Sequence, residues 1–134
     1  MAEFSIPVRV YYEDTDAAGV VYYANYLKFM ERARTDYLRS LGFDQSVLRE
    51  EHGVSFVVRK AAVDFRAPAR FDELLDVSAG IASRRRASFD FAQLVSCEGR
   101  PLVSAQVQIA CVDAESFRPR PVPQTLIEVL EREC

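Results

Sequence analysis

The chain has 134 residues, enough for one domain with a sizeable core and too few for two ordinary domains, so we expect a single domain over residues 1–134. Apolar residues make up 49% and charged residues 28%, which is typical of a globular protein, and a net charge of −3 does not favour nucleic acid or an anionic membrane as a partner. No apolar run approaches the ~20 residues of a membrane helix, and the first residues do not resemble a signal peptide. We therefore expect a cytoplasmic protein with no transmembrane segment.

Residues 4–12 alternate around Val8, Val10 and Tyr12, which predicts a strand, and Pro7 favours an edge position or a strand start. Residues 22–41 then show helical periodicity, and Gly42 is a typical helix stop. At ~1.5 Å per residue, such a helix spans roughly 30 Å. Its predicted apolar face consists of Tyr23, Tyr26, Leu27, Met30, Ala33, Tyr37, Leu38 and Leu41. A short helix over 44–51, beginning at Asp44, is expected to follow.

Four strands are predicted over residues 54–65, 74–83, 87–97 and 102–112, and a short helix around 126–130 closes the chain. Residues 54–65 carry apolar side chains in both registers, so both faces should be covered. In the last strand, Ser104, Gln106 and Gln108 should face away from the core. This order indicates an α+β domain in which a five-stranded, mostly antiparallel sheet curls around one long central helix. One helix cannot cover both faces of such a sheet, so the leftover apolar face predicts pairing with a second copy.

The cysteines and the histidine argue against several kinds of site. Cys97, Cys111 and Cys134 are odd in number and far apart, which argues against a disulfide framework or a zinc site. Cys97 and Cys111 should be small buried side chains, and Cys134, at the terminus, needs no role. His52 is the only histidine, so a multi-histidine metal site is excluded, and its polar surroundings indicate a surface role. No metal is expected.

The segment "YEDTDAAGVVYYANY", residues 12–26, places three carboxylates beside small residues and a helix start. The first N–H groups of a helix lack internal acceptors and carry partial positive charge, so they can hold a carbonyl oxygen that becomes an oxyanion. An ionised Asp16 beside them could attack an acyl carbon or take a proton from water. From spacing alone, however, a turn or capping role for Asp14 or Asp16 is the simpler interpretation.

The stretch "VYYEDTDAAGVVYYANYLKFMERARTDYLRSLGF" resembles the signature of hotdog-fold acyl-CoA thioesterases of the 4-hydroxybenzoyl-CoA thioesterase family. More narrowly, it is similar to the Tol-Pal-associated (YbgC-type) branch. The stretches "FVVRK", "DFRAPARFDELLDV" and "CVDAESFRPRPVP" agree with that branch, so the resemblance covers nearly the whole chain.

The resemblance assigns roles to residues near the helix start. It matches Asp16 to the catalytic aspartate, either nucleophile or general base, and Tyr12 to a tyrosine that lines the site. It matches the backbone of Val21, Tyr22 and Tyr23 to the helix start that polarises the thioester oxygen. Asp14 is then structural and Glu13 solvated. The branch usually has histidine where this chain has Tyr23, and a phenol with a pKa near 10 can donate a hydrogen bond but cannot act as a base at neutral pH. Helix packing is the alternative role for Tyr23.

Arg84, Arg85 and Arg86 form the only run of three like charges. Its simplest interpretation is a solvated strand end. In the family, the matching segment binds coenzyme A phosphates, often from the neighbouring subunit, which makes Arg85 and Arg86 candidates with Ser88 assisting. Guanidinium groups suit phosphates because they offer a charged, bidentate fork. Arg59 and Lys60 are weaker candidates.

The resemblance implies hydrolysis of acyl-CoA thioesters without a metal or other cofactor, in a dimer or tetramer. A hotdog dehydratase is disfavoured because His52 lies in the wrong segment. The alternative from another class is a non-catalytic scaffold that binds acyl-CoA or an acyl carrier protein, with partners linked to the Tol-Pal system.

Overall fold

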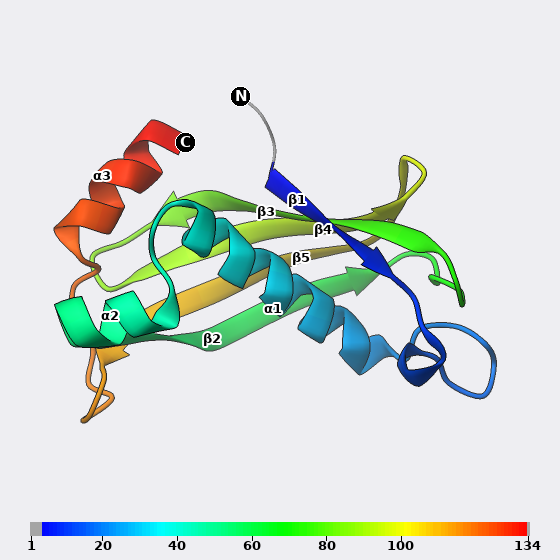
Figure 1. The fold of residues 1–134 in the computed structure, drawn as a ribbon, viewed down its shortest axis with the longest axis horizontal. Coiled ribbons are helices and arrows are strands. Elements are labelled where there is room, and N and C mark those ends of the chain that lie inside the picture. Colours follow the sequence, from blue (N-terminus) through cyan, green and yellow to red (C-terminus); the bar gives the residue numbers. More distant parts are fainter. Residues whose placement is uncertain (1–3, 134) are drawn as a thin grey trace.

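The computed structural model describes residues 4–133, so Cys134 lies outside the described residues. Figure 1 shows a single sheet with one long helix lying across it. In chain order, the elements are β1 (Phe4–Arg9), a 3-10 turn η1 (Tyr12–Asp14), α1 (Tyr23–Ser40), α2 (Gln45–His52), β2 (Val54–Phe65), β3 (Leu74–Arg84), β4 (Ser88–Cys97), β5 (Arg100–Asp113) and α3 (Gln124–Glu133). Among these helices, none combines the length and the apolar character needed to cross a membrane.

The sheet has the strand order β1-β3-β4-β5-β2, and every neighbouring pair is antiparallel. The five-stranded antiparallel sheet around one long helix is therefore confirmed. The first strand ends at Arg9, three residues earlier than predicted, because the chain leaves the sheet and turns through η1.

The core lies between α1 and the facing side of β3, β4 and β5. Phe29 and Met30 of α1 are buried there with Phe89 and Phe91 of β4. The predicted buried face of α1 is only partly right, because Tyr23 and Leu27 are exposed. The residues of α1 that are buried are Tyr26, Phe29, Met30, Ala33, Arg34, Tyr37 and Leu38. Cys97 and Cys111 are buried, as predicted.

β2 is an edge strand, and its middle corrects one expectation. Residues 58–62 are all exposed, and Val58 is 53% exposed. The prediction that both faces of residues 54–65 are covered is therefore wrong for a single chain. β2 pairs only with β5, so within the described residues its other edge has no neighbouring strand. A long edge strand with exposed apolar residues is a natural place for another chain to pair.

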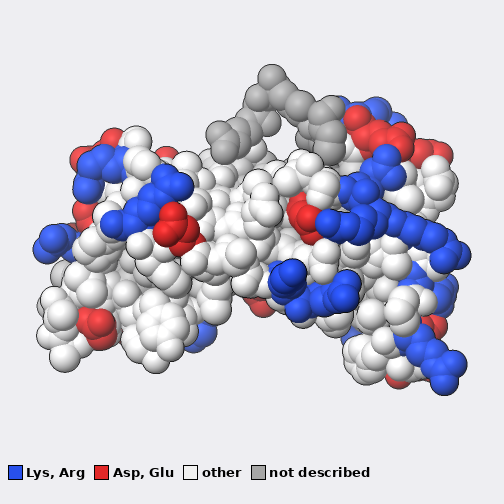
Figure 2. Space-filling view, turned by 180° about the vertical axis from the view of Figure 1, so that it is seen from behind, with Lys and Arg blue, Asp and Glu red and all other residues white. Residues whose placement is uncertain are grey.

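The face of the sheet turned away from α1 is not the leftover apolar face that we expected. β5 alternates as predicted, with Ser104, Gln106 and Gln108 on this outer side, and Ala92 and Ser96 of β4 share it. Figure 2 shows this side, with Lys and Arg gathered toward the ends and little charge in the middle. Most of the exposed large apolar residues lie instead on β2 and around the start of α1.

Candidate active site

Residues 15–21 form a tight hairpin that leads into α1. Thr15 pairs with Val21, and the Asp16 N–H donates to the Val20 carbonyl over 2.9 Å. The turn needs a residue in the left-handed region, which Gly19 supplies with φ +81°. On its other side, the hairpin is held by the Val21 N–H, which donates to the Ala69 carbonyl over 2.9 Å. Backbone hydrogen bonds thus hold Asp16 close to the start of α1.

The Asp16 side chain is exposed and partly engaged. Its Oδ1 accepts the Ala18 N–H over 2.9 Å, which is the hydrogen bond of an Asx turn. Its Oδ2 has no partner among the described residues. The simple turn role considered for Asp16 is therefore present, and one carboxylate oxygen is still available for chemistry.

Asp14 connects η1 to the start of α1 by hydrogen bonds. Its Oδ2 accepts the Tyr11 N–H over 2.9 Å, and its carbonyl oxygen accepts the Tyr22 N–H over 2.9 Å and the Asn25 side-chain amide over 3.0 Å. These contacts agree with the structural role expected for Asp14. Glu13 is exposed, and its side chain makes no hydrogen bond with the described residues.

The free N–H groups at the helix start are not the predicted set. Val21 and Tyr22 already donate to the carbonyls of Ala69 and Asp14, so neither has an N–H left for a ligand. Tyr23 and Ala24 begin α1, and within residues 4–133 their N–H groups have no acceptor and no side-chain cap. Sequence reasoning missed Ala24 because it began the helix one residue too early.

A pocket of about 290 Å³ lies beside these N–H groups, between the start of α1 and the segment after β2. The Tyr23 ring stands edge-on to Phe65 with 6.2 Å between centroids, and the Tyr26 ring also packs on Phe65, with 5.8 Å between centroids. The Tyr26 hydroxyl accepts the Ala69 N–H over 2.9 Å, and burial raises the pKa of Tyr26. The pocket is lined by Val21, Tyr23, Tyr26, Phe65, Arg66, Ala67 and Pro68.

The two tyrosines expected at the site lie in different surroundings. Tyr23 is 61% exposed and lines the pocket at the helix start, where a hydrogen bond with it raises the pKa of Tyr22. Tyr12 is 77% exposed and stacks on Phe71, with centroids 4.1 Å apart. It lines a second pocket of about 420 Å³, with Val10, Tyr11, Glu13, Phe71 and Asp72.

The phosphate-binding candidates differ in availability. Arg85 forms an ion pair with Asp90 at 3.1 Å, and the hydrogen bond from Arg85 lowers the pKa of Asp90. Ser88 is only 8% exposed. Arg86 and Lys60 are exposed, and their side chains have no hydrogen-bond or ion-pair partner among the described residues.

Within one chain, Arg85 and Arg86 are far from Asp16. Asp72, just before β3, donates to Val10 beside the Asp16 hairpin, whereas the arginines follow the other end of β3. At about 3.3 Å per residue, the ten steps from Leu74 to Arg84 span roughly 33 Å. Figure 1 accordingly shows the β3–β4 turn near α3, at the end of the sheet opposite the start of α1. Lys60 is nearer, five residues before Phe65 on β2.

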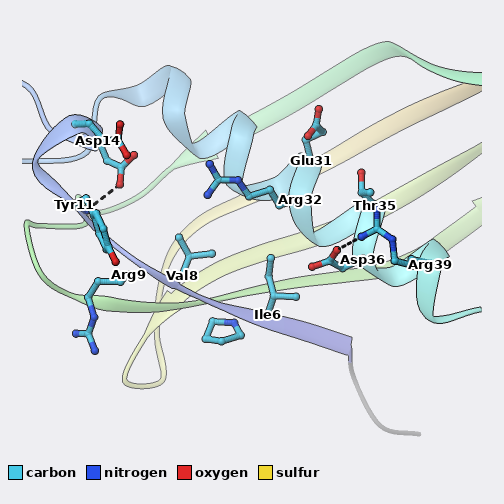
Figure 3. A pocket seen from close by; sticks show the side chains of 12 residues that line it. Ile6, Val8, Arg9, Tyr11, Asp14, Glu31, Arg32, Thr35, Asp36 and Arg39 are labelled. Carbon is cyan, nitrogen blue, oxygen red and sulfur yellow. Dashed lines mark hydrogen bonds and ion pairs between the residues drawn. The ribbon is translucent and has the colours of Figure 1, made fainter. Parts of the chain in front are cut away.

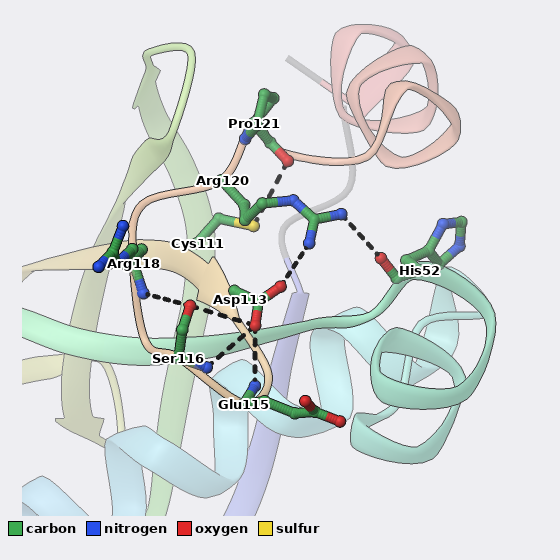
Figure 4. A network of polar contacts seen from close by, with 8 residues as sticks. All are labelled: His52, Cys111, Asp113, Glu115, Ser116, Arg118, Arg120 and Pro121. Atoms are coloured by element: carbon green, nitrogen blue, oxygen red, sulfur yellow. Dashed lines mark hydrogen bonds and ion pairs between the residues drawn. The ribbon is translucent and has the colours of Figure 1, made fainter.

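Two other polar regions lie outside this site. A groove of about 710 Å³ between β1 and α1 is lined by side chains of both signs, among them Arg9, Glu31 and Arg32 (Figure 3). At the far end, Asp113 accepts hydrogen bonds from the turn that follows β5 and from Arg120, which also donates to the His52 carbonyl over 3.4 Å (Figure 4). Among residues 4–133, no three His, Cys, Asp or Glu side chains gather as a metal site would need.

The family model of the thioesterase-like superfamily matches residues 10–130, nearly the whole chain. The chain belongs to the thioesterase-like superfamily. This membership confirms the resemblance drawn from the residues, the hotdog fold and the expected enzyme class, a thioesterase.

Individual relatives of this thioesterase agree. The acyl-CoA thioester hydrolase YbgC of Escherichia coli O6:H1 is 48% identical over 125 residues, which cover 92% of each chain. A probable thioesterase from Bartonella henselae has a similar structure, with a TM-score of 0.86, 38% identity and coverage of 91% of this chain and 100% of that one. A 1,4-dihydroxy-2-naphthoyl-CoA thioesterase from Synechocystis also has a TM-score of 0.86, with 25% identity over 96% of each chain.

Proposed function

We propose that this thioesterase hydrolyses acyl-CoA thioesters to a free carboxylic acid and coenzyme A. The observation that carries the proposal is the 48% identity to an acyl-CoA thioester hydrolase over 92% of both chains. The geometry at the helix start supports it, since a carboxylate with one unpaired oxygen and two unpaired N–H groups lie on a single short hairpin and helix start.

In this reaction, the thioester oxygen accepts hydrogen bonds from the N–H groups of Tyr23 and Ala24. A donor of this kind can contribute about 2.7–4 kcal/mol to the transition state. The unpaired oxygen of Asp16 either attacks the acyl carbon or takes a proton from an attacking water. In the first route, coenzyme A leaves as the thiolate, and water then hydrolyses the mixed anhydride on Asp16. In the second, water adds to the carbonyl directly. Neither route needs a metal or redox cofactor.

The two tyrosines bind the substrate in this proposal. Tyr23 lines the pocket at the helix start, and its hydroxyl is a hydrogen-bond donor for the acyl group. Tyr12 offers an exposed ring beside the same hairpin. The Synechocystis relative acts on an aromatic acyl group, and the aromatic wall of Tyr23, Tyr26 and Phe65 suits an aromatic or aliphatic chain equally.

Coenzyme A phosphates bind Arg86 and Lys60 most readily, because both side chains are exposed and unpaired among the described residues. Arg85, Arg59 and Ser88 would contribute after rearrangement, since Arg85 is paired with Asp90 and Ser88 is buried. The separation of roughly 33 Å along β3 means that Arg86 reaches the site only from another copy of the chain. This is one reason to expect a dimer or tetramer, and the free edge of β2 is another.

A second candidate function is a non-catalytic scaffold that binds acyl-CoA or an acyl carrier protein, with partners linked to the Tol-Pal system. It is favoured by one observation, the exposed Asp16 whose Oδ1 is already used within its turn. A scaffold would keep the pocket and the phosphate-binding residues without needing a reactive carboxylate.

Thiol release from short-chain, long-chain and aromatic acyl-CoAs separates the two functions. We expect the wild-type chain to hydrolyse at least one of them, and Asp16→Asn to lower turnover by about 10²–10⁴-fold while remaining folded. Glu13→Gln is the matched control because it removes the same charge from the same segment and should leave turnover unchanged. Binding without hydrolysis across the panel would establish the scaffold, and full activity of Asp16→Asn would remove Asp16 from the mechanism.

A further inference from the structure

Arg34 is a buried cation without an anionic partner. It lies on α1 and is only 9% exposed, yet within residues 4–133 it forms no ion pair. Arginine is almost never fully buried unless it is paired, because an uncompensated buried charge is costly. Burial lowers the pKa of Arg34 and neighbouring Glu31 raises it, but a guanidinium stays charged at neutral pH.

Gln93 holds the Arg34 side chain in position. The Gln93 Oε1 accepts one guanidinium N–H over 3.0 Å, and its Nε2 donates to the carbonyls of Met30 over 2.9 Å and Ser78 over 3.1 Å. Gln93 is 4% exposed, so this cluster lies in the core. A guanidinium has five N–H donors, and this bond uses one of them.

Arg34 has accessible donors, and its side chain lines a cavity. No buried side-chain nitrogen among the described residues lacks a partner, so the unused N–H groups must reach accessible space. Arg34 lines a partly open cavity of about 160 Å³ between α1, α2 and the β2 side of the sheet. Most of the other walls are apolar, formed by Leu38, Phe43, Leu48, Phe56, Phe91 and Ile109.

We infer that this cavity is a binding site for a small monocarboxylate, whose carboxylate pairs with Arg34 and whose apolar part fills the space toward Phe91 and Ile109. The volume fits, because an apolar cavity of about 150 Å³ holds one benzene ring. Carboxylates match the guanidinium fork, which can bind both oxygens at once.

The nearby acids favour a singly charged ligand. Glu31 and Asp44 also line the cavity, and neither is within ion-pair distance of Arg34. Asp44 is already engaged, since its Oδ1 accepts the Val47 N–H at the start of α2. Two negative charges at the walls oppose a dianion such as phosphate more strongly than a monocarboxylate.

The proposed reaction releases a ligand of this class, because thioester hydrolysis yields a carboxylic acid. This link rests on the proposed function, whereas the site itself does not. The test therefore measures binding rather than turnover, so that a failure of acyl-CoA hydrolysis leaves its result unaffected.

Calorimetric titration with benzoate, and with its neutral analogue benzamide, tests the site. We expect benzoate to bind more tightly than benzamide, and Arg34→Met to weaken benzoate by at least about tenfold. Arg32→Met is the matched control: it removes an exposed arginine from the same helix and should leave benzoate binding unchanged. Asp16→Asn should also bind benzoate normally.

Several results would overturn the inference. They are the absence of benzoate binding, equal affinity for benzamide, unchanged binding in a folded Arg34→Met, and clearly tighter binding in Asp16→Asn, which would place the benzoate beside the Asp16 carboxylate at the helix start. If Arg34→Met does not fold, Val58→Phe tests the site instead. Val58 lines the cavity and is 53% exposed within one chain, so a larger ring there takes up part of the cavity. It should weaken benzoate, and unchanged affinity would refute the site.

Discussion

Replacing Gln93 with Met tests the polar cluster under α1 most directly. The substitution keeps the length and approximate volume of the side chain but removes its carbonyl and amide. Arg34 then loses the one side-chain acceptor it has among residues 4–133, and the carbonyls of Met30 and Ser78 each lose one donor. The β3–β4 register runs from Val77↔Val95 to Gly80↔Ala92, and the Gln93 side chain bonds to β3 in the interval between these pairs.

The expected cost follows from these three hydrogen bonds. A hydrogen bond to a charged group contributes about 1.5–3 kcal/mol, and each neutral bond contributes ~1 kcal/mol. The methionine recovers part of this by burying an apolar group. We therefore expect Gln93→Met to lower the free energy of unfolding by about 3 kcal/mol.

Urea unfolding at fixed protein concentration measures this change. With a slope of ~2 kcal/mol per molar urea for a domain of this size, the midpoint should fall by about 1.5 M. Gln106→Met is the matched control, because Gln106 is exposed on the outer face of β5, and it should change stability by less than about 0.5 kcal/mol. The double variant Arg34→Met with Gln93→Met should cost less than the sum of the single changes, since no unpaired cation remains. A loss below about 1 kcal/mol in Gln93→Met would refute the reasoning.

Three further predictions concern other parts of the chain. Tyr26→Phe leaves the buried Ala69 N–H without its acceptor, and we expect about 1–3 kcal/mol of lost stability in urea unfolding, with no change indicating that water replaces the hydroxyl. Hydrogen bonds from the backbone of Ser116 and Glu115, together with Arg120, lower the pKa of Asp113, so its contribution to stability is present above its unfolded pKa of about 3.9 and is lost as the pH falls through the lower folded value. Unfolding midpoints measured from about pH 5 to pH 2 should therefore fall less steeply for Asp113→Asn than for the wild-type chain. Burial raises the pKa of Cys111 to about 11, so a thiol reagent at pH 8 should leave Cys111 unmodified in the native protein, as peptide mass spectrometry would reveal.

The fold was largely predictable because periodicity reports burial. Helical spacing located α1 to within one residue at each end, and alternation along β5 separated its buried from its outer side chains. The prediction for residues 54–65 was wrong in the middle of the strand: apolar side chains in both registers suggested cover on both faces, whereas residues 58–62 are exposed within one chain. Sequence periodicity does not distinguish apolar residues that are buried within their own chain from those that are buried by another chain.

The site was less predictable because its chemistry depends on individual hydrogen bonds. Sequence reasoning placed Asp16 beside a helix start, but it could not show that Val21 and Tyr22 already donate to carbonyls or that Ala24 has a free N–H. Arg34 and Gln93 were not singled out either. The sequence does show both as polar residues on otherwise apolar faces of α1 and β4. Their contact, however, is seen only in the structure.

The hairpin of residues 15–21 also affects the expected kinetics of ligand association. Val21 donates to the Ala69 carbonyl, and Tyr22, just before α1, donates to the carbonyl of Asp14, just before the hairpin, so the carboxylate and the helix amides are preorganised before any ligand arrives. Binding then does not include the entropic cost of ordering a flexible segment, which would lower the affinity. Association should accordingly proceed in a single kinetic phase whose rate rises linearly with ligand concentration, without the plateau that a closing lid would impose.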